Sequence, residues 1–149
     1  MNLRYIKSSE KRKIISELNE NFGITKLPYL LIEAGKEKMR AFSGSLSKEE
    51  ISLIGSITRI ESIGLYAMKK ESPIRLSFDF PHLITDQLTK NILEINDNQV
   101  KDWMKGQNLE IKKERGICLI KHGNYFLGCG KSTGEKIINH VPKDRRLRK

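Results

Sequence analysis

The chain has few cysteines, and it lacks any long apolar run. Only Cys118 and Cys129 of its 149 residues are cysteines, with neither a CxxC pair nor a nearby pair of histidines. We therefore expect no metal site and no disulfide framework, but two buried thiols. No apolar segment approaches the roughly 18 residues of a membrane-spanning helix, and the amino end "MNLRYIKSSEKRK" has no apolar stretch typical of a signal peptide. We expect a soluble, cytoplasmic protein without a membrane partner.

Acidic residues are also in deficit. The chain has 28 Lys and Arg against 18 Asp and Glu, which gives a formal net charge of +10. Residues 91–149 hold 13 basic and 7 acidic residues, and most of this excess lies at the carboxy end. Such an excess predicts attraction to polyanions, with nucleic acid first and an anionic membrane second. An apolar content of 38% is enough for a modest core.

The first half of the chain reads as a small α+β unit. Ile14, Leu18 and Phe22 recur on one face of a helix predicted over 8–23, with Ser8 or Ser9 as its cap and Gly23 as its end. A hairpin follows with its turn at Gly35, and then a short helix begins at a capping box of Ser47 and Glu50. Two strand-like runs follow, within 58–70 and 73–80, and the second alternates apolar and polar residues as a half-buried strand does. Pro81 begins a predicted helix over 81–90.

The second half changes to short strands around one short helix. Strands are predicted over 91–95 and 136–142, with a hairpin over 116–132 that turns at 122–124. The helix, 97–106, has Asp97 as its predicted cap, Trp103 on its inner face and Gly106 as its end. Many short strands around one helix favour a compact, barrel-like β module.

The stretch "FLGCGKSTGEK", 126–136, superficially resembles a nucleotide-binding phosphate loop. That motif requires a glycine at position 125, which is Tyr125 here, and a long helix after it, which the sequence does not predict. Two compatible interpretations remain. The glycines let another segment approach a strand closely, or they keep the strand surface low so that an RNA backbone can lie beside Lys131.

The run 91–147, from "NILEI" through "KGQNL" and "FLGCGKS" to "KDRRL", resembles a PUA domain. Its last part, "GEKIINHVPKDRRL", is similar to the carboxy-terminal PUA-like region of RNA cytosine methyltransferases of the Nol/Nop/Sun group. The first 80 or so residues resemble the α+β domain that precedes PUA in ribosome-biogenesis factors. These resemblances imply an α+β protein with a small pre-PUA-like domain over 1–88 and a PUA-type β pseudo-barrel over 89–149.

The resemblance also implies a function. The methyltransferases carry a large cofactor-binding domain with catalytic cysteines, for which this chain has neither the length nor the motifs. We therefore expect a protein without enzymatic activity or cofactor that binds structured RNA, ribosomal RNA foremost, in ribosome biogenesis or RNA modification. The alternative is an adaptor that recruits an RNA methyltransferase or an assembly factor.

PUA domains hold RNA along the edge formed by the first helix and the last strands. The resemblance transfers this role to basic and small residues at the helix end, after the glycine strand and after the last strand: Lys105, Gly106, Gln107, Lys131, Lys143, Arg145 and Arg146. A solvated basic tail is the alternative.

Other polar and aromatic residues are predicted to have structural roles. Trp103 is expected in the core, Tyr125 is a candidate for an exposed stacking platform, and Asp79 is expected to cap a helix. Neither His122 nor His140 has a catalytic partner at a recognisable spacing, so no catalytic residue is predicted.

Overall fold

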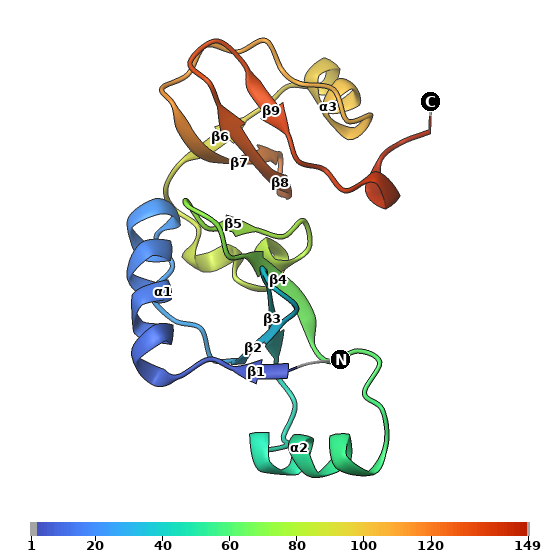
Figure 1. Ribbon diagram of the computed structural model, residues 1–149. Helices are drawn as coiled ribbons and strands as arrows, with labels where there is room; N and C mark the ends of the chain where they lie inside the picture. Colours follow the sequence, from blue (N-terminus) through green and yellow to red (C-terminus); the bar gives the residue numbers. More distant parts are fainter. Residues whose placement is uncertain (1–2, 149) are drawn as a thin grey trace.

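The computed structural model describes residues 3–148, which form two sheets, three α-helices and three short 3-10 turns (Figure 1). The first sheet comprises β1 (Leu3–Tyr5), β2 (Leu30–Ala34), β3 (Lys38–Phe42), β4 (Leu65–Lys69) and β5 (Arg75–Leu76). The second comprises β6 (Ile92–Glu94), β7 (Gly116–His122), β8 (Tyr125–Ser132) and β9 (Ile137–Asn139). The helices are α1 (Ser8–Phe22), α2 (Lys48–Ile57) and α3 (Asp97–Met104), and the turns are η1 (Phe80–Leu83), η2 (Thr85–Gln87) and η3 (Lys143–Arg145).

Both sheets follow the order of their strands along the chain. Strands β1 to β5 form an antiparallel meander, whereas β6 pairs parallel with β7 and the remaining pairs are antiparallel. The mixed architecture confirms the predicted α+β class. The proposed division after residue 88 falls between the two sheets, and we call the parts on either side the amino-terminal and the carboxy-terminal module. In Figure 1, α2 lies at the end of the molecule farthest from the carboxy-terminal module.

Helix α1 follows its predicted pattern but not its predicted cap. Ile14, Leu18 and Phe22 are buried, and Gly23 ends the helix with a φ of 89°. The prediction that Ser8 or Ser9 caps the helix was wrong, because the capping position is Lys7, which makes no side-chain hydrogen bond there. Strand β1, which the sequence patterns did not predict, leaves only two residues before the helix, so the paired strand sets the helix start.

The other two helices begin with capping boxes. Ser47 and Glu50 exchange the predicted pair of hydrogen bonds at the start of α2, at 3.1 and 3.2 Å. At the start of α3, Asn96 and Gln99 do so at 2.9 Å each, so the prediction of Asp97 as the cap was wrong. The carboxylate of Asp97 instead lies 3.0 Å from His122 Nε2 on β7.

The two modules share one hydrophobic core. Phe22 and Phe80 from the first module are fully buried in the same cluster as Leu119, Phe126 and Cys129 from the second. The segment between the sheets departs from the prediction here. Ser77 Oγ accepts a hydrogen bond from the Phe80 backbone N–H at 3.1 Å, so the chain turns into η1 before the expected strand is complete. The predicted helix over 81–90 is replaced by the turns η1 and η2.

A second, smaller core lies inside the carboxy-terminal module. Trp103 is fully buried there, as predicted, and its indole N–H donates to the Leu127 carbonyl at 2.7 Å. Both cysteines are buried and free, also as predicted. Within residues 3–148, no helix is both long and apolar enough to cross a membrane.

Candidate nucleic-acid interface

Two segments of the carboxy-terminal module form one surface. They are the end of α3, residues 103–108, and the tail after β9, residues 139–147. The side-chain amide of Asn139 donates to the carbonyls of Trp103 at 2.7 Å and Gln107 at 2.8 Å. Farther along the tail, the Leu147 backbone N–H donates to the Met104 carbonyl at 2.7 Å. We call this the α3–tail surface, and it brings together two of the sequence segments predicted to bind RNA.

Gly106 and Arg146 are in direct contact on the α3–tail surface. Gly106 has a φ of 91°, and a Cβ atom at this position would lie only 2.7 Å from the guanidinium carbon of Arg146. The Arg146 Nε donates to the Val141 carbonyl at 2.9 Å, which holds this side chain across the helix end. The backbone conformation therefore favours glycine at position 106, and any side chain there would also displace that of Arg146.

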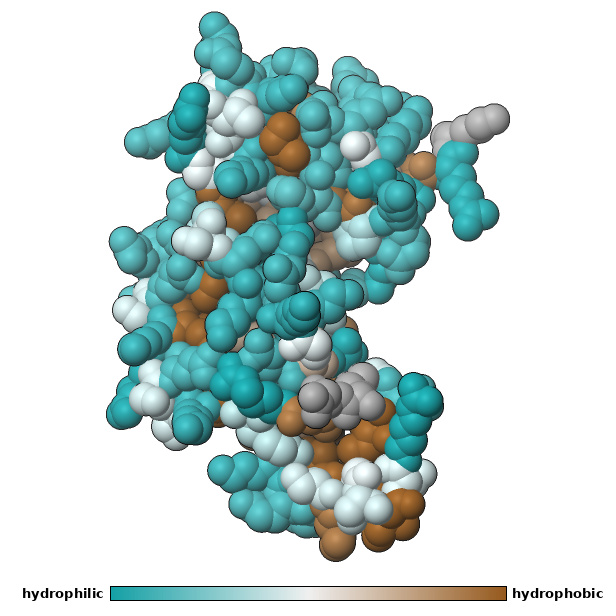
Figure 2. Space-filling model, in the orientation of Figure 1, coloured by the Kyte–Doolittle hydropathy of each residue, from teal (hydrophilic) through white to brown (hydrophobic). Residues whose placement is uncertain are grey.

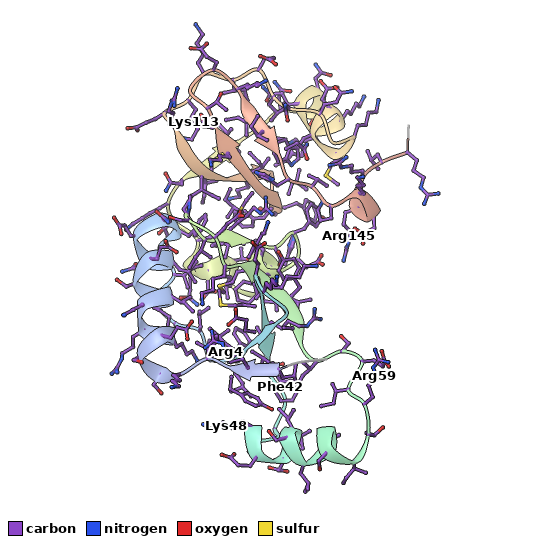
Figure 3. The ribbon with its side chains drawn as sticks, in the orientation of Figure 1. Arg4, Phe42, Lys48, Arg59, Lys113 and Arg145 are labelled. Atoms are coloured by element: carbon purple, nitrogen blue, oxygen red, sulfur yellow. The ribbon has the colours of Figure 1, made fainter. Side chains whose placement is uncertain are left out.

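The remaining cations of the α3–tail surface differ in their surroundings. Lys105, Gln107 and Lys143 are exposed, as an interface requires. Arg145 points from η3 toward the amino-terminal module (Figure 3), where it donates to Asp79 at 2.7 Å and lies 5.9 Å above the Phe78 ring. Asp79 occupies the predicted capping position, at the start of the 3-10 turn η1, but its side chain makes no cap hydrogen bond there and pairs with Arg145 instead. Part of the charge of Arg145 is thus neutralised within the chain.

Lys131 lies apart from these residues. It lies on β8 and lines a cavity between the two sheets, together with Arg75 and His140. None of the other residues predicted to bind RNA lines this cavity. The glycines before Lys131 allow other segments to approach strand β8 closely, as one of the two interpretations predicted. A Cβ at Gly130 would lie 2.4 Å from Ile137 Cγ2 and 3.1 Å from the Trp103 ring. Strand β8 continues to Ser132 without a following helix, so this segment is not a phosphate loop of the Walker kind.

The titratable groups of this module have structural partners. His122 lies 2.8 Å from the Ile95 carbonyl through Nδ1 and 3.0 Å from Asp97 through Nε2. Burial raises the pKa of the Cys129 thiol to about 12, which leaves it protonated and unreactive at neutral pH. Among residues 3–148 no group of three or more His, Cys, Asp or Glu side chains could hold a metal ion. Tyr125 is 67% exposed, in keeping with the predicted platform.

Sequence patterns gave no sign of Asn139, the residue that joins the two halves of the α3–tail surface. Three of its hydrogen bonds reach residues more than 30 positions away along the chain, and its side-chain oxygen also accepts from the Val141 backbone N–H at 2.8 Å. The one local signal is a polar residue at the end of an otherwise apolar strand, "KIINHVP". Such a residue commonly faces solvent, so the signal does not distinguish a structural amide from an exposed one.

Comparison with known proteins supports the assignment of this module. Residues 90–147 match the family described as the methyltransferase RsmF PUA domain. A segment of 57 residues is 35% identical to the ribosomal RNA small subunit methyltransferase F of Shewanella oneidensis; the match covers 36% of this chain and 12% of that protein. The chain therefore spans only a small part of the length of this curated relative.

A solved structure extends the likeness in fold to nearly the whole chain. It is the structure of a conserved PUA domain protein from Thermoplasma acidophilum, which superposes with a TM-score of 0.62 over 96% of this chain and 95% of that one. The sequence identity is 15%, so this likeness concerns the fold alone. The predicted resemblance to PUA-domain proteins, and to the carboxy-terminal region of the Sun and RsmF methyltransferases, is confirmed.

Proposed function

We propose that this chain, a PUA-domain protein related to the carboxy-terminal region of RsmF, binds structured RNA without chemistry of its own, with ribosomal RNA as the foremost ligand. Its place would be in ribosome biogenesis or RNA modification. The α3–tail surface carries this proposal, because hydrogen bonds hold Lys105, Lys143 and Arg146 on two joined segments of the matched domain. The family model that matches describes the PUA domain of a methyltransferase and not its catalytic part, which supports a binding role.

Phosphate contacts would supply most of the affinity. Lysine and arginine side chains release counterions from a nucleic-acid backbone, and an arginine can donate two parallel hydrogen bonds to one phosphate. The Val141 carbonyl engages Nε of Arg146, and the terminal nitrogens make no hydrogen bond to any residue within 3–148, so they are available to a ligand. Selectivity would come from RNA shape, since double-stranded RNA is recognised through its backbone and minor groove rather than through base sequence.

The proposal is tested by fluorescence anisotropy with a labelled, folded ribosomal RNA fragment in the presence of excess unrelated RNA. Arg146→Ala and Lys105→Ala are expected to weaken binding, whereas Lys48→Ala on the distant helix α2 serves as the control. Point substitutions are preferable to a deletion of the tail, because Leu147 is hydrogen-bonded to Met104 and the deletion would disturb α3. Binding that unrelated RNA abolishes, or that all three variants weaken equally, would contradict the proposal.

A second candidate function, the recruitment of an RNA methyltransferase or an assembly factor, is favoured by helix α2. Its side chains Leu53 and Ile57 are 62% and 78% exposed, and only Ile51 of the helix is buried. Figure 2 shows apolar side chains gathered at this end of the molecule. Exposed apolar patches of this kind often mark protein interaction sites.

The recruitment hypothesis is tested with Leu53→Ser combined with Ile57→Ser. Both side chains are exposed, so we expect the fold to persist. The variant should lose a defined methyltransferase or assembly factor that the unaltered chain retains after nuclease treatment, while RNA binding stays unchanged. Retention by both proteins, or loss of self-association alone in size-exclusion chromatography, would count against recruitment.

A further inference from the structure

A cavity of about 300 Å³ lies between the two sheets, and His140 is the one residue of the described α3–tail surface in its lining. Lys69 and Arg75, which are cross-strand partners on β4 and β5, form one wall. Ile117 and Lys131, cross-strand partners on β7 and β8, form another, and His140 follows β9. Strand register therefore brings basic side chains from both modules to one cavity.

The polar groups of this cavity are mainly hydrogen-bond donors. Arg75 Nη1 lies 2.5 Å from His140 Nδ1, and because a guanidinium can only donate, Nδ1 is the acceptor and the ring proton is on Nε2. Glu71 is the single carboxylate in the lining, and it is shared between Lys69 at 3.3 Å and Arg75 at 3.5 Å. Lys131 has no acidic side chain within ion-pairing distance among residues 3–148.

We propose that this cavity binds a phosphate group, supplied by the RNA backbone, through Lys131, Arg75 and the Nε2–H of His140. This inference rests on the proposed RNA binding and adds a second contact that the amino-terminal module helps to build. A phosphate presents acceptor oxygens in several directions, which matches donors that converge from two sheets. Lys69, Arg75 and Lys131 are balanced only by Glu71 in the lining and by Glu37, which pairs with Lys69 at 3.3 Å, so one positive charge remains in excess. The volume is sufficient for a single phosphate group.

His140 provides a direct measure of occupancy. Burial first, and then the charge of Arg75, lower the pKa of His140; Lys69 and Lys131 act in the same direction, and Glu71 acts against them. These are the charged groups that face the ring from β4, β5, their connecting turn and β8. A phosphate beside Nε2 favours the imidazolium, in which Nδ1 carries a proton and no longer accepts from Arg75, so the midpoint of His140 titration should move to higher pH when the ligand is bound.

Nuclear magnetic resonance can follow this titration, because the chain has only 3 histidines. Imidazole signals are recorded across pH in buffer, with inorganic phosphate, and with the folded RNA fragment. We expect each ligand to raise the protonation constant of His140 about tenfold, and to leave His82 and His122 unchanged. Lys131→Ala should abolish the phosphate effect, whereas Lys136→Ala, a nearby lysine outside the cavity lining, should preserve it.

The two ligands separate the failure of this site from the failure of RNA binding. If inorganic phosphate and bound RNA both leave His140 unchanged, the site is refuted whether or not RNA binds. If RNA binds but only inorganic phosphate shifts the titration of His140, the cavity binds free phosphate. The proposal that the RNA backbone supplies the phosphate is then refuted. If inorganic phosphate shifts the titration of His140 and no RNA binds, the proposed function is refuted, whereas phosphate binding in the cavity is supported.

Discussion

The salt dependence of RNA affinity offers a quantitative test of the α3–tail surface. Four cations are assigned to it, namely Lys105, Lys143, Arg145 and Arg146. Each phosphate contact contributes about −0.9 to the slope of the logarithm of affinity against the logarithm of salt concentration, so four contacts, with Arg145 exchanging Asp79 for a phosphate, give about −3.6. Raising the salt concentration fourfold should then weaken binding about 150-fold.

Replacing Arg145 and Arg146 with alanine should halve that slope, to about −1.8, so that the same change in salt weakens binding only about 12-fold. The assay is anisotropy of the labelled RNA fragment at four or more salt concentrations, with circular dichroism to verify folding. Arg12→Ala combined with Lys13→Ala removes the same charge from exposed positions on α1. An unchanged slope in the first variant, or an equal decrease in this control, would refute the placement of the site.

The ion pair of Arg145 with Asp79 refines this prediction. Asp79→Asn removes the partner at 2.7 Å and frees the full charge of Arg145 for a phosphate. Asp144→Asn serves as the control, because it changes the net charge by the same amount at the residue before Arg145 on η3. Among residues 3–148, Asp144 forms no salt bridge. We expect Asp79→Asn to raise affinity more than Asp144→Asn does. Equal effects of the two substitutions would mean that Arg145 only joins the modules.

Three further predictions concern stability and reactivity. Gly106→Ala should cost about 1–2 kcal/mol in backbone strain and also the hydrogen bond of Arg146 Nε to Val141, because the Arg146 side chain must move, whereas Gly35→Ala, whose Cβ would meet nothing within 4 Å, should cost the strain alone; equal losses in urea denaturation would contradict this. Hydrogen bonds from Arg4 and then Lys70 lower the pKa of Glu10 to about 2, so its stabilisation is complete above the ordinary value of 4.5 and is lost as the pH falls toward 2. Glu10→Gln should flatten the pH dependence of stability in that window, and parallel profiles would refute the pairing. Cys129, with a pKa of about 12, should react with a thiol reagent at pH 8 only on unfolding, and rapid labelling of the native protein would disprove its burial.

Local patterns were sufficient to predict the elements whose signals lie within a few residues. The buried stripe of α1 follows from helical spacing, and the hairpin of β2 and β3 follows from two apolar runs around Gly35. The capping box of Ser47 and Glu50 was also visible in the sequence. At α3 the cap is Asn96 rather than the adjacent Asp97, because Gln99 three residues later completes a capping box with Asn96.

The candidate site was predictable only in part, because long-range contacts decide its geometry. The contact of Gly106 with Arg146 joins two segments that the resemblance had named separately. By contrast, the pairing of Arg145 with Asp79 spans 66 residues, and no local pattern signals it. Lys131 was grouped with the tail cations, but its register opposite Ile117 turns it toward the cavity between the sheets. β1 is a three-residue strand, too short to show a periodicity.

The shared core has a consequence for recognition by shape. Phe80 and Phe126 pack in one cluster, and His82 Nε2 donates to the Phe126 carbonyl at 3.0 Å, so side chains of the two modules are buried together. An apolar interface of this kind resists relative motion of the modules, whereas a polar one would permit it. The α3–tail surface and the cavity at Lys131 would then lie at a fixed separation. A ligand that contacts both sites must present phosphates at that separation. A folded RNA holds phosphates at fixed distances, whereas a flexible polyanion must lose conformational entropy to do so.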